Sequence, residues 1–239
     1  MKKMRLLMAA AAGLAAMAGA ANAEEAKPTF SGNVALTSDY TFRGISQTQE
    51  GPAVQGGFDY GYGSFYAGAW GSNVDFGLSD GSLELDLYAG VKQTVGALGL
   101  DFGVIGYLYP GAADDTAELD YYEGYVKASI NPTEAFTLGG ALYVSPEFTG
   151  EVGTGYYTEI NGALKVSDTL SFSGAVGYQK VDELVFDGDD NYTTWNLGGT
   201  VSAYGFGFDL RYVGTNTEVL LNGGDLADDR AVFSVKRAF

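Results

Sequence analysis

Large apolar side chains alternate with small, polar or charged ones along most of the sequence beyond its N-terminal segment. In the last ten residues, Phe233, Val235 and Phe239 fall on one face, whereas Ser234 and Lys236 fall on the other. Period-two alternation is typical of a β-strand whose two faces lie in different environments. Twelve segments show this pattern, each about as long as an outer-membrane strand, at residues 29–43, 52–61, 64–74, 82–95, 98–109, 119–130, 136–146, 154–166, 169–181, 191–204, 206–215 and 229–239.

The connectors between these segments alternate in length. Short connectors, most of them with Gly, Pro, Asn or Asp turn residues, lie at 62–63, 96–97, 131–135, 167–168 and around Gly205. Long connectors lie at 44–51, 75–81, 110–118, 147–153, 182–190 and 216–228. This alternation and the even number of segments are typical of up-and-down barrels. We therefore expect an all-β fold: a single antiparallel transmembrane β-barrel of about 12 strands, with short periplasmic turns and longer extracellular loops.

The N-terminal segment has the features of a secretory signal peptide. Lys2, Lys3 and Arg5 precede a short apolar run, and Ala21-Asn22-Ala23 supplies a small-x-small cleavage site. We expect residues 1–23 to be this signal peptide and residues 24–239 to form the barrel domain in the bacterial outer membrane. A soluble lipocalin-like barrel or sandwich would share the strand rhythm, but it would not need both an export signal and an aromatic C-terminal residue.

The C-terminal Phe239 resembles the signal that the outer-membrane barrel assembly machinery recognises in bacterial barrels. That pattern usually has a bulky apolar residue third from the end, where this chain has Arg237. We expect the Arg237 side chain to extend to the membrane–water interface. The resemblance predicts that the assembly machinery is a partner of this chain.

Alternation also assigns side chains to the two faces of the predicted barrel, although residues 65–74 can be phased either way. The lipid-facing set is predicted to contain Val34, Leu36, Tyr40, Phe42, Leu83, Leu85, Leu87, Leu100, Phe102, Val104, Leu108, Leu138, Leu142, Val144, Ile160, Leu164, Val166, Phe172, Val176, Tyr178, Trp195, Leu197, Val201, Phe208, Leu210 and Tyr212. Charges at membrane depth must face water or each other. The predicted pore-lining set is therefore Asp39, Arg43, Asp59, Glu84, Asp86, Lys92, Asp101, Glu123, Lys127, Glu159, Lys165, Asp209, Arg211, Arg230 and Lys236.

Composition excludes several kinds of chemistry. The chain has no His and no Cys, which excludes a Ser-His hydrolase, a His-ligated zinc site and a Cys nucleophile. No paired-carboxylate motif singles itself out for acid–base catalysis, so we expect no enzyme activity and no cofactor. The 36 Gly and 17 Tyr are assigned to crowded strands and to aromatic girdles at the membrane surfaces.

The predicted mature chain is strongly acidic, with a formal charge of 10 − 30 = −20, and we expect no nucleic-acid partner. Asp187, Asp189 and Asp190 have part of the spacing of a calcium loop but lack its bidentate Glu. We interpret these residues, with 114–115 and 225–229, as solvated loop charge and predict no metal site. Such loops would bridge through divalent cations to lipopolysaccharide phosphates at the lipid surface.

The predicted pore-lining set has seven bases and eight acids, which permits two interpretations. The charges could line a narrow water channel for small polar solutes or ions, with a preference for cations. They could instead pair across the interior, Asp209 with Lys236 and Arg230 with Asp39, and plug a structural or adhesive barrel. A lumen of twelve strands permits either. Asp39 and Arg43 are the predicted constriction or rim pair, or an ion pair that fixes a loop.

Residues 37–47, Thr-Ser-Asp-Tyr-Thr-Phe-Arg-Gly-Ile-Ser-Gln, bring in a family resemblance. Together with 57–60, 65–74 and 84–90, they resemble the TorF-type porins of proteobacteria. The specific part covers residues 30–90, and the rest is similar in length and strand rhythm. The resemblance implies an outer-membrane barrel with a pore, without a named substrate or catalytic residues, and its family marks fall on Ser38, Asp39, Tyr40, Phe42, Arg43 and Gly44.

Overall fold

The computed structural model describes residues 27–77, 81–112 and 118–239, so the predicted signal peptide lies outside the described residues. No helix in this part of the chain is long and apolar enough to cross a membrane. The elements are β1 Thr29–Thr37, β2 Thr41–Phe42, β3 Ile45–Ser46, β4 Ala53–Tyr62, β5 Phe65–Asn73, β6 Leu83–Val95, β7 Leu98–Leu108, β8 Tyr121–Thr133, β9 Phe136–Ser145, the 3-10 helix η1 Thr149–Glu151, β10 Gly155–Lys165, β11 Leu170–Lys180, β12 Asn191–Ala203, β13 Phe206–Thr215, β14 Leu220–Leu221, β15 Gly224–Asp225 and β16 Arg230–Ala238.

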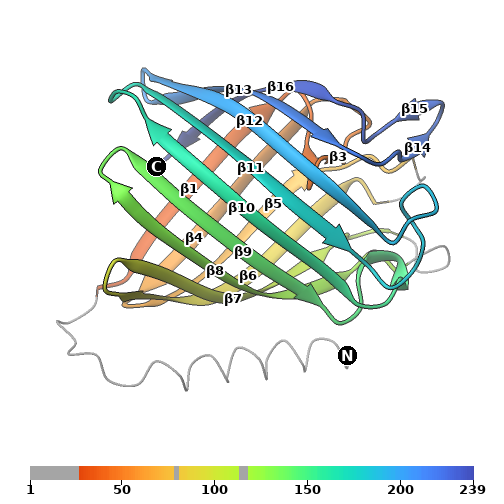
Figure 1. Cartoon of the computed structure of the whole chain (residues 1–239), viewed down its shortest axis with the longest axis horizontal. Helices are drawn as coiled ribbons and strands as arrows, with labels where there is room; N and C mark the ends of the chain where they lie inside the picture. Colours follow the sequence, from red (N-terminus) through yellow and green to blue (C-terminus); the bar gives the residue numbers. More distant parts are fainter. Residues whose placement is uncertain (1–26, 78–80, 113–117) are drawn as a thin grey trace.

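Twelve of the strands in the described residues pair as a closed antiparallel barrel, in the ring order β1-β4-β5-β6-β7-β8-β9-β10-β11-β12-β13-β16 (Figure 1). The first and last strands close the ring, with Thr37 opposite Ser234 and Asn33 opposite Ala238. Beyond this register, the backbones of Gly32 and Phe239 exchange two hydrogen bonds of 2.8 and 2.9 Å. The predicted barrel of about 12 strands is therefore confirmed.

Most strands begin and end within a few residues of their predicted bounds. The turn residues that interrupt the alternation in the sequence lie where the pairing between strands ends. One predicted turn is shorter than expected. β8 continues to Thr133, with a register irregularity between Ile130 and Thr133, so that only residues 134–135 join it to β9.

The first predicted strand, 29–43, is wrong beyond Thr37. β1 ends there, and the chain turns into the barrel, where β2 and β3 form a short hairpin of their own. Tyr40 and Phe42, predicted to face lipid, instead pack against a buried cluster inside the barrel. The alternation continues through them because a hairpin also has two different faces.

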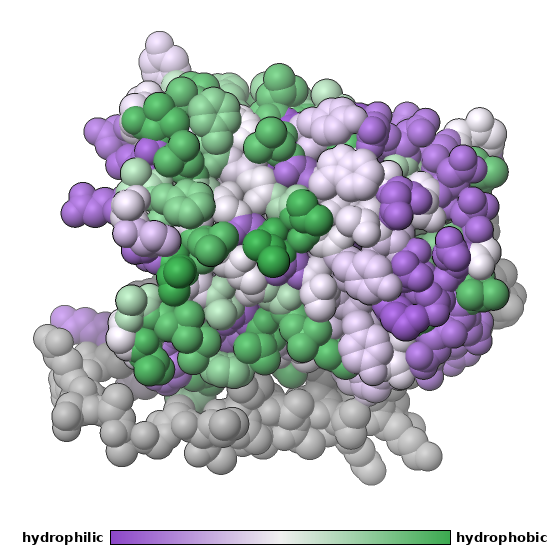
Figure 2. Space-filling model, in the orientation of Figure 1, coloured by the Kyte–Doolittle hydropathy of each residue, from purple (hydrophilic) through white to green (hydrophobic). Residues whose placement is uncertain are grey.

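The outer surface carries the predicted apolar band. Ile160, Leu197 and Leu210 are all at least 60% exposed, and the other predicted lipid-facing side chains of the barrel strands are exposed or half-buried. Residues 65–74, whose phase was open, turn Tyr66 and Trp70 inward. Figure 2 shows the hydrophobic side chains gathered over the short-turn part of the wall and hydrophilic ones at the end with the long loops. The closed barrel with this exterior places the protein in the bacterial outer membrane, as predicted.

Candidate functional site

The lumen is entered by residues 38–51, called here the inward segment, which leave the wall after β1 and return to it at β4. The hairpin of β2 and β3 lies at its centre, and the two turn residues, Arg43 and Gly44, have φ of 49° and 89°. Two positive φ values are those of a type I′ turn. A Cβ on Gly44 would lie 2.5 Å from Oγ1 of Thr194 and 2.4 Å from Cγ2 of Thr215. The hairpin tip therefore fits closely against β12 and β13.

Arg43, at this tip, is buried against the wall opposite β1. Its Nη2 donates to Oε2 of Glu123 on β8 at 2.6 Å, and its Nη1 donates to Oε1 of Gln179 on β11 at 2.7 Å. The guanidinium also lies over the rings of Phe42 and Tyr157, 4.7 and 4.3 Å from their centroids. The Arg43 and Glu123 side chains are only 6% and 1% exposed. This buried, hydrogen-bonded ion pair fixes the hairpin across the lumen.

Asp39 anchors the base of the inward segment. Its Oδ1 accepts hydrogen bonds from Ser46 Oγ at 2.6 Å and from Thr48 Oγ1 at 2.9 Å. Its Oδ2 accepts from Nη1 of Arg230 on β16 at 3.0 Å, and Nη2 of Arg230 lies 3.3 Å from Glu50. The predicted pairing of Asp39 with Arg230 is therefore present. Asp39 and Arg43 do not share a strand face as predicted, because both lie beyond the end of β1.

Aromatic side chains occupy the lumen around the inward segment at the long-loop end. The Tyr40 ring packs edge-on against Trp70 at 5.4 Å, and its hydroxyl donates to Glu84 at 2.6 Å. Phe42 packs edge-on against Tyr107 at 5.6 Å. These residues contact a buried cluster formed by Val74, Tyr107, Tyr109, Tyr121, Phe148, Val181, Phe186 and Tyr192. The long-loop half of the lumen is therefore densely packed.

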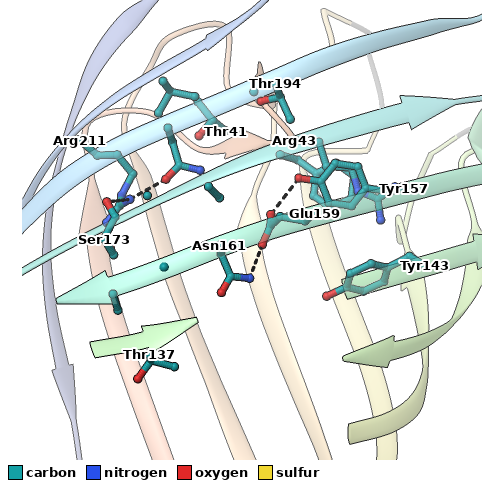
Figure 3. Close-up of a pocket in the computed structure, with 18 of the residues that line it drawn as sticks. Thr41, Arg43, Thr137, Tyr143, Tyr157, Glu159, Asn161, Ser173, Thr194 and Arg211 are labelled. Atoms are coloured by element: carbon teal, nitrogen blue, oxygen red, sulfur yellow. Dashed lines mark hydrogen bonds between the residues drawn. The ribbon is translucent and has the colours of Figure 1, made fainter. Parts of the chain in front are cut away.

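The short-turn half contains three cavities of about 550, 630 and 500 Å³. Tyr143 lines all three, so they adjoin one another, and together they are called the vestibule. Arg43 and Gly44 of the hairpin bound the first cavity, and polar side chains such as Thr137 and Asn161 line its wall (Figure 3). A fourth, apolar cavity of about 340 Å³, lined by Phe42, lies among the aromatic side chains of the long-loop end.

Three predicted pore-lining charges lie side by side in the vestibule wall. Lys92 on β6 is directly opposite Asp101 on β7, and Asp101 is directly opposite Lys127 on β8. Asp101 accepts a hydrogen bond from Tyr66 Oη at 2.6 Å. The ammonium of Lys92 lies 4.7 Å from the Tyr66 ring centroid, and that of Lys127 lies 4.5 Å from the Tyr125 centroid. Both lysines therefore rest on aromatic faces within the vestibule wall.

Two further carboxylates of the vestibule are held by neutral donors. Asp59 on β4 accepts from Tyr88 Oη at 2.7 Å. Glu159 on β10 accepts from Tyr157 Oη at 2.9 Å and from Asn161 Nδ2 at 2.8 Å, as Figure 3 shows. These hydrogen bonds orient the two carboxyl groups, and neither has a cationic partner in the described part of the chain.

The predicted pairing of Asp209 with Lys236 is wrong. Asp209 instead lies 3.2 Å from the guanidinium of Arg211, its neighbour two residues along the same face of β13. Lys236 is exposed near the short-turn end. Lys165 also lies at this rim, 2.7 Å from Asp168, in a pair that is largely exposed to solvent. Lys236 and Lys165 therefore border the mouth of the vestibule at the short-turn end.

The structure separates the fifteen predicted charges along the barrel axis. The long-loop half, called the outer layer, has two bases and four acids, 2 − 4 = −2, contributed by Asp39, Arg43, Glu84, Asp86, Glu123 and Arg230. The vestibule and its rim have five bases and four acids, 5 − 4 = +1, contributed by Asp59, Lys92, Asp101, Lys127, Glu159, Lys165, Asp209, Arg211 and Lys236. The nearly balanced total therefore combines an acidic layer with a weakly basic one.

The acid-rich loop at 182–190 forms a small turn. Phe186 and Asp189 exchange backbone hydrogen bonds of 2.9 Å, and Asp190 pairs with Lys180. Hydrogen bonds from Lys180 and Asn191 lower the pKa of the Asp190 carboxyl. Within residues 27–77, 81–112 and 118–239, no group of three acids, His or Cys could hold a metal ion.

Sequence reasoning missed Gln179, Tyr143 and Tyr157, three of the side chains that surround Arg43. Gln179 was detectable as an uncharged polar residue in the lumen-facing phase of β11. The inward position of Tyr157 is indicated only indirectly, by Gly177 on the neighbouring strand. A Cβ on Gly177 would lie 2.2 Å from the Tyr157 hydroxyl. The glycine makes room for the inward tyrosine.

Solved outer-membrane channels have similar folds. A structure described as "KdgM porin" aligns with a TM-score of 0.59 at 10% identity, over 87% of this chain and 99% of that chain. The structure described as "NanC porin structure in rhombohedral crystal form" gives 0.58 at 8% identity, over 88% and 98%. The COG4313 outer membrane channel from Pseudomonas putida F1 gives 0.51 at 11% identity, over 92% and 100%. At these identities the similarity establishes the fold.

No curated protein matches this chain. A family model does, and it matches residues 21–239, nearly the whole sequence. The chain therefore belongs to the family described as "Bacterial protein of unknown function (Gcw_chp)".

Proposed function

We propose that this protein is a narrow porin-like channel through which small polar solutes or ions diffuse across the outer membrane. The observation that carries the proposal is the vestibule: cavities of about 550, 630 and 500 Å³, lined by charged and hydroxyl side chains, adjoin directly beneath the inward segment. A barrel whose only role was structural would gain nothing from a large polar lumen lined by oriented charges. In this proposal the inward segment is the gate that closes the outer half of the channel.

The alternative is a non-conducting structural or adhesive barrel, and one observation favours it. The outer half of the lumen is closed by two buried ion pairs, Arg43 with Glu123 and Asp39 with Arg230, in contact with an aromatic cluster. The two functions differ in one respect: a channel requires the inward segment to leave its seat, and a structural barrel requires it to stay.

We further propose that the channel favours cations. The outer layer has a net charge of 2 − 4 = −2. Acidic long loops raise the local cation concentration within a Debye length of about 8 Å at physiological salt. The vestibule, with its net charge of +1, opposes this, so the preference should be moderate.

Single-channel recording on the refolded protein in planar bilayers tests the proposal. Wild type should show small conductance steps and a reversal potential that favours cations in a salt gradient. Glu84→Gln, which removes one acid of the outer layer, should shift the reversal potential towards anions. The matched vestibule variant, Lys92→Gln, should shift it the opposite way. Silence in the wild type and in variants that loosen the inward segment would leave the structural barrel as the function.

The remaining parts of the proposal concern partners and relatives. The acidic long loops are proposed to bind lipopolysaccharide through divalent cations, and the Phe239 end is proposed to be read by the barrel assembly machinery. The resemblance of residues 30–90 to TorF-type porins supports a pore and stays a prediction. The proposal assigns no catalytic step, cofactor or nucleic-acid partner to the chain.

A further inference from the structure

The outer layer contains more buried acid than its ion pairs neutralise. Glu84, Asp86 and Glu123 are 1%, 7% and 0% exposed. Among these three carboxylates, only Glu123 has a cationic partner in the described structure, which is Arg43 of the inward segment. Removing a carboxylate from water without a counter-charge is strongly unfavourable. The seated inward segment therefore covers a site whose charge is unbalanced.

Two buried oxygens of this group have no hydrogen-bond partner among the described residues: Oδ1 of Asp86 and Oε1 of Glu123. Glu84, in contrast, accepts from Tyr40 at 2.6 Å, and the other oxygen of Glu123 accepts from Arg43 and from Tyr107 at 2.6 and 3.1 Å. Asp86 is thus the least satisfied acid of the outer layer.

The titratable groups that face Asp86 from the packed elements are acids and phenols. On its own strand these are Glu84 and Tyr88, and from the inward segment it is Tyr40. The two neighbouring strands place Trp70 and Tyr107 directly opposite Asp86 in register. Beyond them, Tyr109 follows β7 and Glu123 lies on β8. A negative charge on Asp86 would face two other acids and a set of hydroxyl dipoles.

We propose that Asp86 is a proton-binding site that ties the seating of the inward segment to pH. With the segment seated, Asp86 holds a proton and is neutral, which removes the unpaired buried charge. When the proton leaves, the carboxylate needs fuller hydration than its 7% exposure provides, and withdrawal of the segment supplies it. Seating is therefore favoured at low pH and lost as pH rises. This inference rests on the proposed channel, for which it supplies the regulation.

The inward segment is suited to such release because its own backbone does not favour the seated form. Arg43, Gln49 and Glu50 all have φ between 48° and 61°, in the left-handed region that non-glycine residues seldom adopt. Contacts with the barrel wall, rather than local preference, hold these residues in place. A charge on Asp86 weakens those contacts. It therefore shifts the equilibrium between the seated and the released segment towards release, which the backbone conformation already favours.

The experiment measures seating and conduction separately. Because the chain has no Cys, Ile45→Cys in the refolded full chain provides a single thiol on the inward segment. Its labelling rate by a water-soluble maleimide is measured between about pH 6 and about pH 9, a range in which exposed carboxylates stay ionised. The rate is divided by that of Tyr204→Cys, whose position is 96% exposed, to remove the reactivity of the thiol itself. The relative rate should rise by up to about tenfold per pH unit, the limit for one proton.

Asp86→Asn keeps the size of the side chain and its neutral state, so it should hold the relative rate at its low-pH value throughout. Asp209→Asn, which alters a buried carboxylate outside the outer layer, should keep the wild-type pH slope. Parallel rates with and without Asp86→Asn would overturn the proton site. Labelling that behaves as expected in a protein that never conducts would keep the proton site and overturn the channel. Conduction with pH-independent labelling would keep the channel and overturn the proton site.

Discussion

The ion pair of Arg43 with Glu123 offers the most direct test of what closes the lumen. In the variant Arg43→Met, a chain of similar length replaces the guanidinium, so Glu123 keeps its burial but loses its cation and one hydrogen-bond donor. The two side chains are 6% and 1% exposed and their charged atoms are 2.6 Å apart. Removing one partner of such a buried pair costs about 3–5 kcal/mol. Because Glu123 can regain water only by release of the inward segment, most of this cost falls on the seated form.

This cost predicts the size of the effect. At about 1.4 kcal/mol for each factor of ten, the full cost would lower the ratio of seated to released segment by about 10² to about 4 × 10³. In planar bilayers, Arg43→Met should therefore show open times that are long compared with those of the wild type. In liposomes of the same protein content, it should speed the swelling caused by small polar solutes.

The double variant Arg43→Met with Glu123→Leu separates the loss of the pair from the loss of packing. Replacing both partners of a buried ion pair by apolar residues is often neutral or stabilising, so the double variant should close again. Lys165→Met, at the rim pair with Asp168, is the control for a cation removed from solvent, where the expected cost is about 0–1 kcal/mol. Equal conductance in wild type and Arg43→Met, at equal insertion, would refute the view that this pair holds the segment.

Two further predictions concern the hairpin and the closure of the ring. Gly44→Ala should also favour the released segment, because its Cβ would lie 2.4–2.5 Å from Thr215 and Thr194, and single-channel open times would measure this; Gly96→Ala, at φ 62° with nothing within 4 Å, should leave open times unchanged. Deleting Phe239 should reduce the folded, heat-modifiable fraction in outer-membrane preparations, because its backbone exchanges two hydrogen bonds with Gly32; an unchanged yield would count against a role in assembly.

The barrel itself could be predicted from the sequence because period-two alternation and turn residues are local signals. The inward segment could not, although its residues were singled out. Tyr40 and Phe42 alternate with Asp39, Thr41 and Arg43 as they would in a membrane strand. Alternation says that two faces differ, but it does not say whether lipid or a protein interior receives the apolar face. Only the partners across the lumen, such as Trp70 and Tyr107, decide this.

The Gly and Tyr content was assigned to crowded strands and membrane girdles, but part of it has another origin. Gly68 lies directly opposite Tyr88, and Gly103 opposite Tyr125, on neighbouring strands. A Cβ on either glycine would lie 2.3–2.5 Å from the opposing ring. Each glycine therefore leaves room for the inward tyrosine of the neighbouring strand, and the tyrosine ring fills part of the lumen. This signal depends on strand register, so composition alone could not reveal it.

The separation of charge along the axis changes the expectation for ion selectivity more than any single contact. Seven bases against eight acids predict a weak preference if they are averaged over the lumen, but ions respond to the narrowest layer they cross. When the inward segment withdraws, the outer layer loses one base and one acid, Arg43 and Asp39. Three acids and one base remain, 1 − 3 = −2 with Asp86 ionised, compared with 2 − 3 = −1 for the seated form in which Asp86 holds a proton. Opening therefore makes the layer more negative and removes the guanidinium that neutralises Glu123, so the open outer layer should attract cations more strongly than the closed one.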